Sequence, residues 1–215
     1  LMDEWYSRIT AVDPMIAEAT GKHYGEAVEG KVPRYDCIYP YKRPVDGKVA
    51  WIRAIGSVER DPSGKAVFMY GVAQDITETK LAQDALAKGQ AQLRYILDTS
   101  PVGVAFSTKG HIHMANPRFV ELFGVGAGQT SLSLYVDQNE RLKIGELIER
   151  DGLVRDREMR MFGKDGQVLD LLVTYLPIEH DGEKGILGWL MDITKRKRME
   201  QQVADQLTFQ QALVD

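Results

Sequence analysis

Two stretches of the chain carry the same pattern of apolar and polar positions, residues 43–81 and residues 162–200. In each stretch an Asp-Gly pair, a long apolar run, a second turn and another apolar run lead to Asp-Ile-Thr and then to a charged segment. An Asp-Gly pair between apolar runs is typical of a β-hairpin, and a Thr before a charged periodic segment marks the start of a helix. The pattern predicts one supersecondary unit that is used twice.

The first half of the chain is predicted to form a helix followed by a three-stranded antiparallel meander. Asp13 and Pro14 supply a helix cap and a proline at the first helical position. Turn-forming residues at Asp46-Gly47 and at 61–64 separate the apolar runs that follow. The expected elements are a helix over 15–28 and strands over 34–42, 49–59 and 66–74.

A long helix is predicted between the two halves, over residues 78–98, with Thr77 as its cap and Pro101 beyond its end. Leu86 and Leu93 are one heptad apart, which favours a helix that pairs with another helix. The alternative is an amphipathic linker that lies on its own domain.

The second half predicts a fuller set of elements in the order β-β-α-α-α-β-β-β, which indicates an antiparallel sheet with helices grouped on one side and therefore the α+β class. The exit helix that follows has a/d spacing, and two glutamines interrupt its apolar seam. The seam positions are Met199, Val203, Gln206, Gln210 and Leu213. The expected strands cover 102–107, 111–115, 154–162, 168–178 and 185–191, and the helical segments begin at Asn116-Pro117, Leu132, Gln138 and Thr194.

Composition narrows the class of protein. The chain of 215 residues is 44% hydrophobic and 27% charged, with a net charge of −4, which is ordinary for a globular protein and argues against a general nucleic-acid surface. No apolar run reaches the roughly 20 residues of a membrane span. The single cysteine, Cys37, excludes an intrachain disulfide and fits a cytoplasmic location, with any membrane anchor elsewhere in a longer parent protein.

The second half resembles the PAS sensor domain. The resemblance rests on residues 96–104, on the segment 116–124 that opens the first helix, on the hairpin pair 165–166 and on Asp-Ile-Thr at 192–194. The first half resembles only the later part of such a domain, because the opening strands and first helices of the family are absent from it.

The resemblance implies a five-stranded antiparallel sheet with helices on one side, in one partial and one complete copy. Tandem arrays of this kind are similar to the input regions of bacterial sensor histidine kinases, some of them hybrid kinases, and less often of cyclic-di-nucleotide enzymes. The implied organisation is a partial domain over 1–77, a helical linker over 78–98, a complete domain over 99–194 and an exit signalling helix over 195–215.

The two Asp-Ile-Thr tripeptides are candidate signal-coupling joints between strand and helix. The Asp can accept hydrogen bonds from the backbone that follows it, the Ile can anchor the chain in the core, and the Thr can cap the helix. Ordinary capping without a signalling role is the alternative. The six residues are Asp75, Ile76, Thr77, Asp192, Ile193 and Thr194.

A ligand pocket is expected between the sheet and the helices of the complete domain. Its candidate lining residues can equally be plain core, and the two-residue period of a strand leaves open which face Thr174 and Tyr175 occupy. The candidates are Phe106, Met114, Asn116, Phe119, Phe123, Leu134, Leu147, Met159, Leu171, Val173, Ile186 and Leu190.

No catalytic or metal site is predicted. His111 and His113 share one face of a strand without an evident third ligand. His23 lies on the helix where haem-binding members of the family carry a proximal histidine, but two nearby glycines and the incomplete domain argue against haem there. Cys37 lies on a strand and not in the helical motif that carries the flavin-reactive cysteine of the family, and 124–131 lacks the lysine of a phosphate loop. The cofactor stays open: none, a flavin or another small organic ligand is conceivable, whereas haem is not expected.

The leading hypothesis is a non-catalytic sensory module that binds a small ligand or a partner and relays its state to a distant output domain in cis, a histidine kinase above all. We expect a homodimer through the linker helices, with no nucleic acid partner and no membrane span in this chain. The rival hypotheses are a ligand-free dimerisation scaffold and the input region of a cyclic-di-nucleotide synthase or phosphodiesterase.

Overall fold

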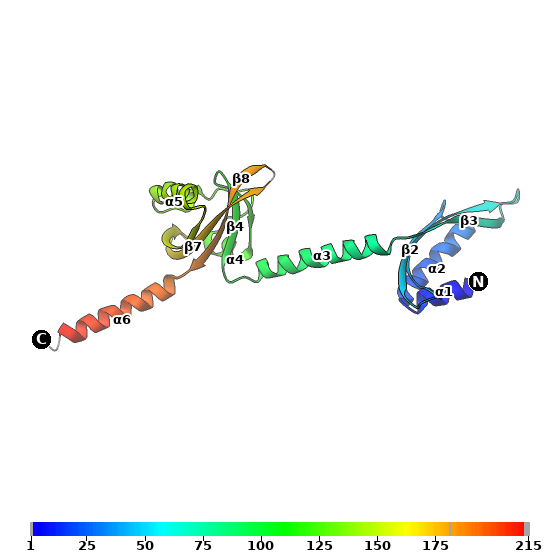
Figure 1. The fold of residues 1–215 in the computed structure, drawn as a ribbon, viewed down its shortest axis with the longest axis horizontal. Helices are drawn as coiled ribbons and strands as arrows, with labels where there is room; N and C mark the ends of the chain where they lie inside the picture. The colour runs from blue at the N-terminus through cyan, green and yellow to red at the C-terminus, as the bar shows by residue number, and fades with distance from the viewer. Residues whose placement is uncertain (1, 181, 213–215) are drawn as a thin grey trace. The chain divides into compact units, whose positions relative to one another are not determined.

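The structure, a computed structural model, describes residues 2–180 and 182–212. The chain forms two compact units, Leu1–Gln90 and Ala91–Asp215, each built on its own antiparallel sheet (Figure 1). The predicted α+β class is confirmed. The predicted domain limits stay a prediction, although helices begin within one residue of the predicted linker and exit helix.

The first unit is the predicted meander with helices packed on it. Its strands lie in the order β1-β2-β3, and α1 and α2 pack against β1. Asp13 caps α2, because its carboxylate accepts the backbone N–H groups of Met15 and Ile16. The elements are α1 (Met2–Thr10), α2 (Pro14–Glu29), β1 (Tyr35–Lys42), β2 (Val49–Arg60) and β3 (Ala66–Asp75).

The helix α1 is not predicted by the sequence pattern. It is only nine residues long, and its stability comes from burying Ile9 against Ala17 and Tyr39 rather than from a local signal. These three residues form the buried cluster of the first unit, with Trp5 packed beside them.

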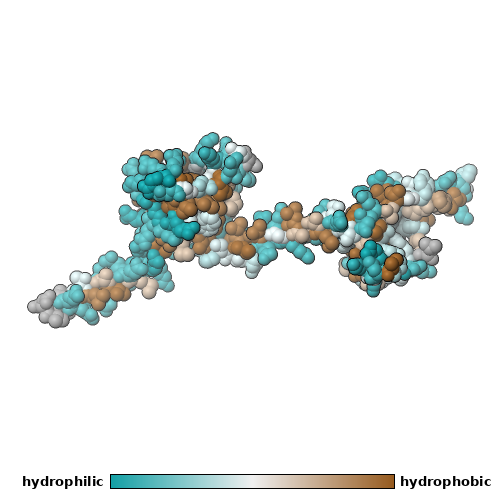
Figure 2. Space-filling model, in the orientation of Figure 1, coloured by the Kyte–Doolittle hydropathy of each residue, from teal (hydrophilic) through white to brown (hydrophobic). Residues whose placement is uncertain are grey.

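The predicted linker helix is α3 (Thr77–Asp98), and none of its residues is buried. Its apolar side chains Leu81, Leu86 and Leu93 are exposed. Figure 2 shows apolar side chains on the surface of α3 and again on that of the exit helix α6 (Thr194–Ala212). The last predicted seam position, Leu213, lies outside the described residues.

The second unit is the predicted five-stranded sheet, with strands in the order β5-β4-β8-β7-β6 and every neighbouring pair antiparallel. Helices α4 and α5 pack on it (Figure 1). The elements are β4 (Gly103–Thr108), β5 (His111–Ala115), α4 (Pro117–Phe123), the short 3₁₀ helix η1 (Leu132–Leu134), α5 (Gln138–Asp151), β6 (Val154–Phe162), β7 (Val168–His180) and β8 (Glu183–Asp192).

The inner face of this sheet carries the core of the second unit. Along β7 the residues Leu169, Leu171, Val173 and Tyr175 are buried, while the residues between them are partly exposed. The period of two places Tyr175 on the inner face and Thr174 on the outer face. This answers the question that the sequence leaves open.

Candidate functional site

The first Asp-Ile-Thr joint ties the start of α3 to the neighbouring strand β2. The Ile76 N–H donates to the Trp51 carbonyl at 2.8 Å, and the Trp51 N–H donates to the Thr77 hydroxyl at 2.9 Å. The Asp75 carboxylate accepts the Thr77 N–H at 2.9 Å and also the Thr77 hydroxyl. These bonds from Thr77 hold the pKa of Asp75 below its usual range.

The second joint repeats this geometry at the start of α6. The Ile193 N–H donates to the Asp170 carbonyl at 2.9 Å, and the Asp170 N–H donates to the Thr194 hydroxyl at 3.0 Å. The Asp192 carboxylate accepts the Thr194 N–H at 2.9 Å. In each joint the first residue of the helix is therefore bonded to a neighbouring strand. Thr77 is bonded to β2, beside β3, and Thr194 is bonded to β7, beside β8.

The role predicted for the Thr residues is corrected by these contacts. Thr77 and Thr194 are the first helical residues, and their hydroxyls accept an N–H from a neighbouring strand rather than from their own helix. The Asp provides the local acceptor instead. The predicted anchoring by the Ile is confirmed at Ile193, which is buried, whereas Ile76 is half-buried.

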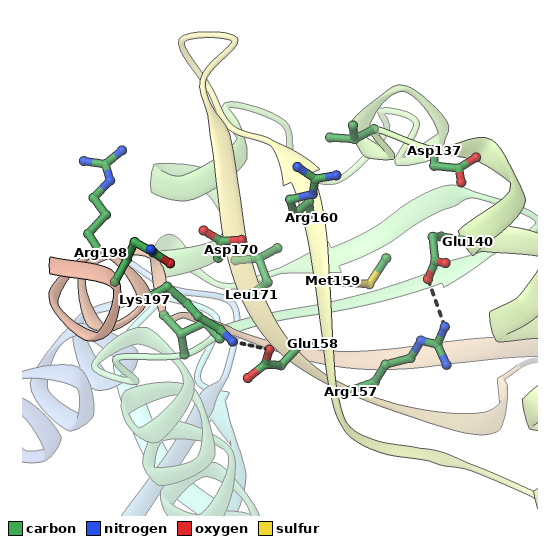
Figure 3. A pocket seen from close by; sticks show the side chains of 13 residues that line it. Asp137, Glu140, Arg157, Glu158, Met159, Arg160, Asp170, Leu171, Lys197 and Arg198 are labelled. Carbon is green, nitrogen blue, oxygen red and sulfur yellow. Dashed lines mark hydrogen bonds and ion pairs between the residues drawn. The ribbon is translucent and has the colours of Figure 1, made fainter. Parts of the chain in front are cut away.

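A polar cleft of about 680 Å³ lies beside the second joint (Figure 3). Lys197 of α6 pairs with Glu158 of β6 at 2.5 Å, and Arg196 approaches the same carboxylate at 3.5 Å. The hydrogen bond to Glu158 raises the pKa of Lys197. The first turn of α6 is thus bound to β7 through the Thr194 hydroxyl and to β6 through ion pairs.

The other wall of the cleft is a second ion pair, between Glu140 in the first turn of α5 and Arg157 of β6 at 3.0 Å. The hydrogen bond from Arg157, with a further one from Lys143, lowers the pKa of Glu140. These charged residues lie outside the predicted site. The sequence signal that could have found them is the alternation along β6, in which a charged residue precedes both Met159 and Met161.

A larger cavity of about 900 Å³ lies on the inner face of the sheet, under α5 and η1. Its apolar lining comes from the sheet and from the helices, with charged side chains among its other lining residues. Burial raises the pKa of both Tyr135 and Tyr175, so both phenols in the lining stay neutral. Residues that the sequence reasoning missed here include Ala105, Ile112, Tyr135, Ile144 and Met161.

The predicted lining residues separate into several environments. Those that line the cavity are Phe119, Leu134, Ile186 and Leu190. Met159 and Leu171 line the polar cleft instead. Core residues outside the lining of both are Phe123, Leu147 and Val173.

Three predicted lining residues have other surroundings. The ring of Phe106 packs on His113 and His180, on the opposite face of β4 from Ala105. Met114 lies opposite Phe106 in the pairing of β4 with β5. The amide of Asn116 is bonded to four backbone groups, which leaves it no free hydrogen bond for a ligand.

The histidines do not assemble a metal site among the described residues. His111 and His113 share a face as predicted, with ring centroids 5.3 Å apart, and the His113 ring contacts the Thr108 hydroxyl at 2.6 Å. His23 packs beside Tyr35 and Glu26. The lining of the 900 Å³ cavity includes no histidine or cysteine among the residues described.

Comparison with known proteins places both units in one family. Residues 1–73 match the family model described as the PAS fold, and residues 91–167 match the family model described as the PAS domain. The sensor protein FixL of Bradyrhizobium diazoefficiens is 24% identical over 161 residues, which are 70% of this chain and 32% of that protein. The chain therefore spans about a third of the length of this relative.

Two solved structures that match this chain are a PAS domain and a sensory box protein. A PAS domain from Colwellia psychrerythraea is 25% identical, with a TM-score of 0.44 over 51% of this chain and 98% of its own. A sensory box histidine kinase/response regulator from Burkholderia thailandensis is 19% identical, with a TM-score of 0.44 over 56% of this chain and 98% of its own.

The described residues contain no helix that is long and apolar enough to cross a membrane. The two matched ranges together cover most of the chain. The chain belongs to the PAS domain family and is a tandem sensory region similar to those of bacterial sensor kinases.

Proposed function

We propose that this chain binds a small, mainly apolar ligand in the 900 Å³ cavity of its second unit and relays the occupancy of the cavity through α6 to an output domain in the same polypeptide. A histidine kinase is the output domain we favour, and the relative that matches along 161 residues is a sensor protein. In this proposal the chain detects the ligand, and any catalysis belongs to the output domain. The proposed location of the whole protein is the cytoplasm.

One observation carries the proposal: the strands that line the cavity are the strands that hold α6. Leu190 of β8 lines the cavity and lies two residues before Asp192. Tyr175 of β7 lines it as well, and the same strand presents Asp170 to Thr194. A ligand that shifts β7 or β8 would therefore act on the first turn of α6 without crossing a flexible loop.

The character of the lining indicates the class of ligand. Apolar side chains such as Ile112, Phe119 and Leu134 would contact a hydrophobic body, and burial of such surface is favourable. Charged residues in the same lining, among them Lys109 and Arg141, could orient a polar end of the ligand. The proposed ligand is held by these apolar and charged contacts, and the lining includes no thiol or imidazole among the described residues.

The exposed apolar residues of the connecting helices support relay through a homodimer. Met199, Val203 and Leu207 recur every four residues on α6 and lie around one apolar surface patch. Pairing of such stripes between two copies would bury them, as in a coiled coil. The competing proposal, a ligand-free dimerisation scaffold, rests on the same helices and needs no occupied cavity.

The test is native mass spectrometry of the purified chain with an absorption spectrum alongside. We expect a bound small molecule in the unaltered chain and its loss in Ile186→Phe, because Ile186 lines the cavity and a larger ring would fill it. Leu187→Phe is the matched control, since the next residue of β8 lies outside the cavity lining. An apo mass in every variant, with or without added cell extract, would favour the scaffold.

A further inference from the structure

One charged side chain of the 900 Å³ cavity differs from the others in its burial. Six charged residues line this cavity in the described part of the chain, and Arg141 of α5 is half-buried, whereas the other five are exposed. Burial of a charged group is unfavourable unless a partner compensates for it. The five exposed residues are Lys109, Glu146, Glu149, Glu179 and Lys184.

Arg141 has no such partner among the residues that the structure describes, because none of their hydrogen bonds or ion pairs involves its guanidinium. Lys143 on the same helix pairs with Glu140 at 3.2 Å. Asp137, one turn before Arg141, instead accepts the backbone N–H of Asn139 at 2.9 Å. The donors of this guanidinium are therefore available to a ligand in the cavity.

The helix α5 also provides space next to this side chain. Arg141, Ile144, Gly145 and Ile148 have the spacing of one helix face, and all four line the cavity. A Cβ atom added at Gly145 would meet no other atom within 4 Å. Glycine inside a helix is unfavourable relative to alanine, and here it leaves room for a ligand group beside Arg141.

A phenol lies close to the same positive charge. Burial raises the pKa of Tyr135, while a hydrogen bond with Tyr175 and the charge of Arg141 act in the opposite direction. Both tyrosines line the cavity. A neutral phenol can donate its O–H to an anion. The guanidinium of Arg141 and the hydroxyl of Tyr135 together offer the donors that a carboxylate accepts.

We propose that the ligand of this cavity is an organic acid with an apolar body, whose carboxylate is bound by Arg141. This inference rests on the proposed function and names the class of its ligand. A guanidinium can hold a carboxylate by two parallel N–H···O hydrogen bonds, and the apolar lining would receive the rest of the molecule. The described lining holds three cations and three carboxylates, so it has no excess positive charge for a ligand with several phosphates.

Titration calorimetry with two probes of equal chain length tests the head group. The chain is first refolded from urea to remove any retained molecule. Octanoate is expected to bind at least ~10-fold more tightly than 1-octanol, because a charged hydrogen-bonded pair is added to the same apolar contacts. Arg141→Gln should remove this preference by weakening octanoate alone. Arg141→Lys should keep part of the preference, since it retains the charge without the planar fork.

Arg150→Gln is the matched control for the loss of one positive charge. Arg150 is exposed on the same helix and lies outside the cavity lining. This variant should bind both probes as the unaltered chain does. A preference for octanoate that survives in Arg141→Gln would overturn the proposal.

The remaining outcomes separate this inference from the proposed function. Equal affinities for the two probes, both lost in Ile186→Phe, would keep the cavity as the ligand site and overturn the role of Arg141. Binding of neither probe would count against the cavity itself and would overturn both proposals. A molecule retained by the purified chain should be a carboxylic acid that is absent from Arg141→Gln, and a neutral molecule in its place would overturn only the inference about Arg141.

Discussion

At the scale of single residues, Asn116 joins three elements of the second unit. Its Oδ1 accepts the N–H groups of Val104 at 2.8 Å and Phe119 at 2.9 Å. Its Nδ2 donates to the carbonyls of Leu97 at 2.9 Å and Val102 at 3.0 Å. The side chain is only 2% exposed, so no water replaces these bonds readily. One amide thus fixes the end of α3, the start of β4 and the cap of α4.

We expect Asn116→Ala to lower the free energy of unfolding of the second unit by about 3 kcal/mol, because it removes a helix cap and leaves buried backbone groups unpaired. Urea denaturation followed by circular dichroism measures the change. Asn139→Ala is the control, since Asn139 lies exposed in the first turn of α5 and should change stability by less than about 0.5 kcal/mol. Equal effects of the two substitutions would contradict the assigned role.

At the scale of elements, the sequence predicts what is local and misses what is distant. Alternating apolar residues and turn chemistry predict the strands, and Asp13 and Asn116 predict two helix starts correctly. The bonds of Thr194 to Asp170 could not be predicted, because they join residues 24 positions apart across two strands. The cavity was only partly predictable, because a pattern shows which residues are apolar but not which of them leave space.

The joint of β8 and α6 gives a prediction at this scale. Thr194→Val keeps the shape of the buried side chain and removes the acceptor of the Asp170 N–H, so the free energy of unfolding should fall by about 1–2 kcal/mol. Hydrogen exchange should accelerate at Asp170 and in the first turn of α6, while the rest of β7 stays protected. Thr208→Val, at an exposed site on the same helix, is the control. Unaltered exchange at Asp170 would show that the hydroxyl does not hold the joint.

At the scale of the whole molecule, the two units differ in how much core each possesses. Among the residues that the structure describes, the buried cluster of the first unit contains three residues, whereas that of the second contains fifteen. Small cores provide little stability against the loss of chain entropy on folding. Several apolar side chains of β3, among them Phe68 and Val72, are also exposed in this unit. The two units should therefore differ in thermal stability, with the first unit the weaker.

Calorimetry of the whole chain should resolve two transitions, and the lower one should belong to the first unit. Ile9→Ala and Ile112→Ala form a matched pair, because each removes the same atoms from a side chain that is 0% exposed. A loss of about 2–5 kcal/mol is usual for such a change, which corresponds to a fall of about 10 °C or more in a domain of this size. Ile9→Ala should move only the lower transition and Ile112→Ala only the upper one. A single transition that both substitutions shift equally would contradict this prediction. It would show that the two cores unfold together, and that the helix α3 couples their stability.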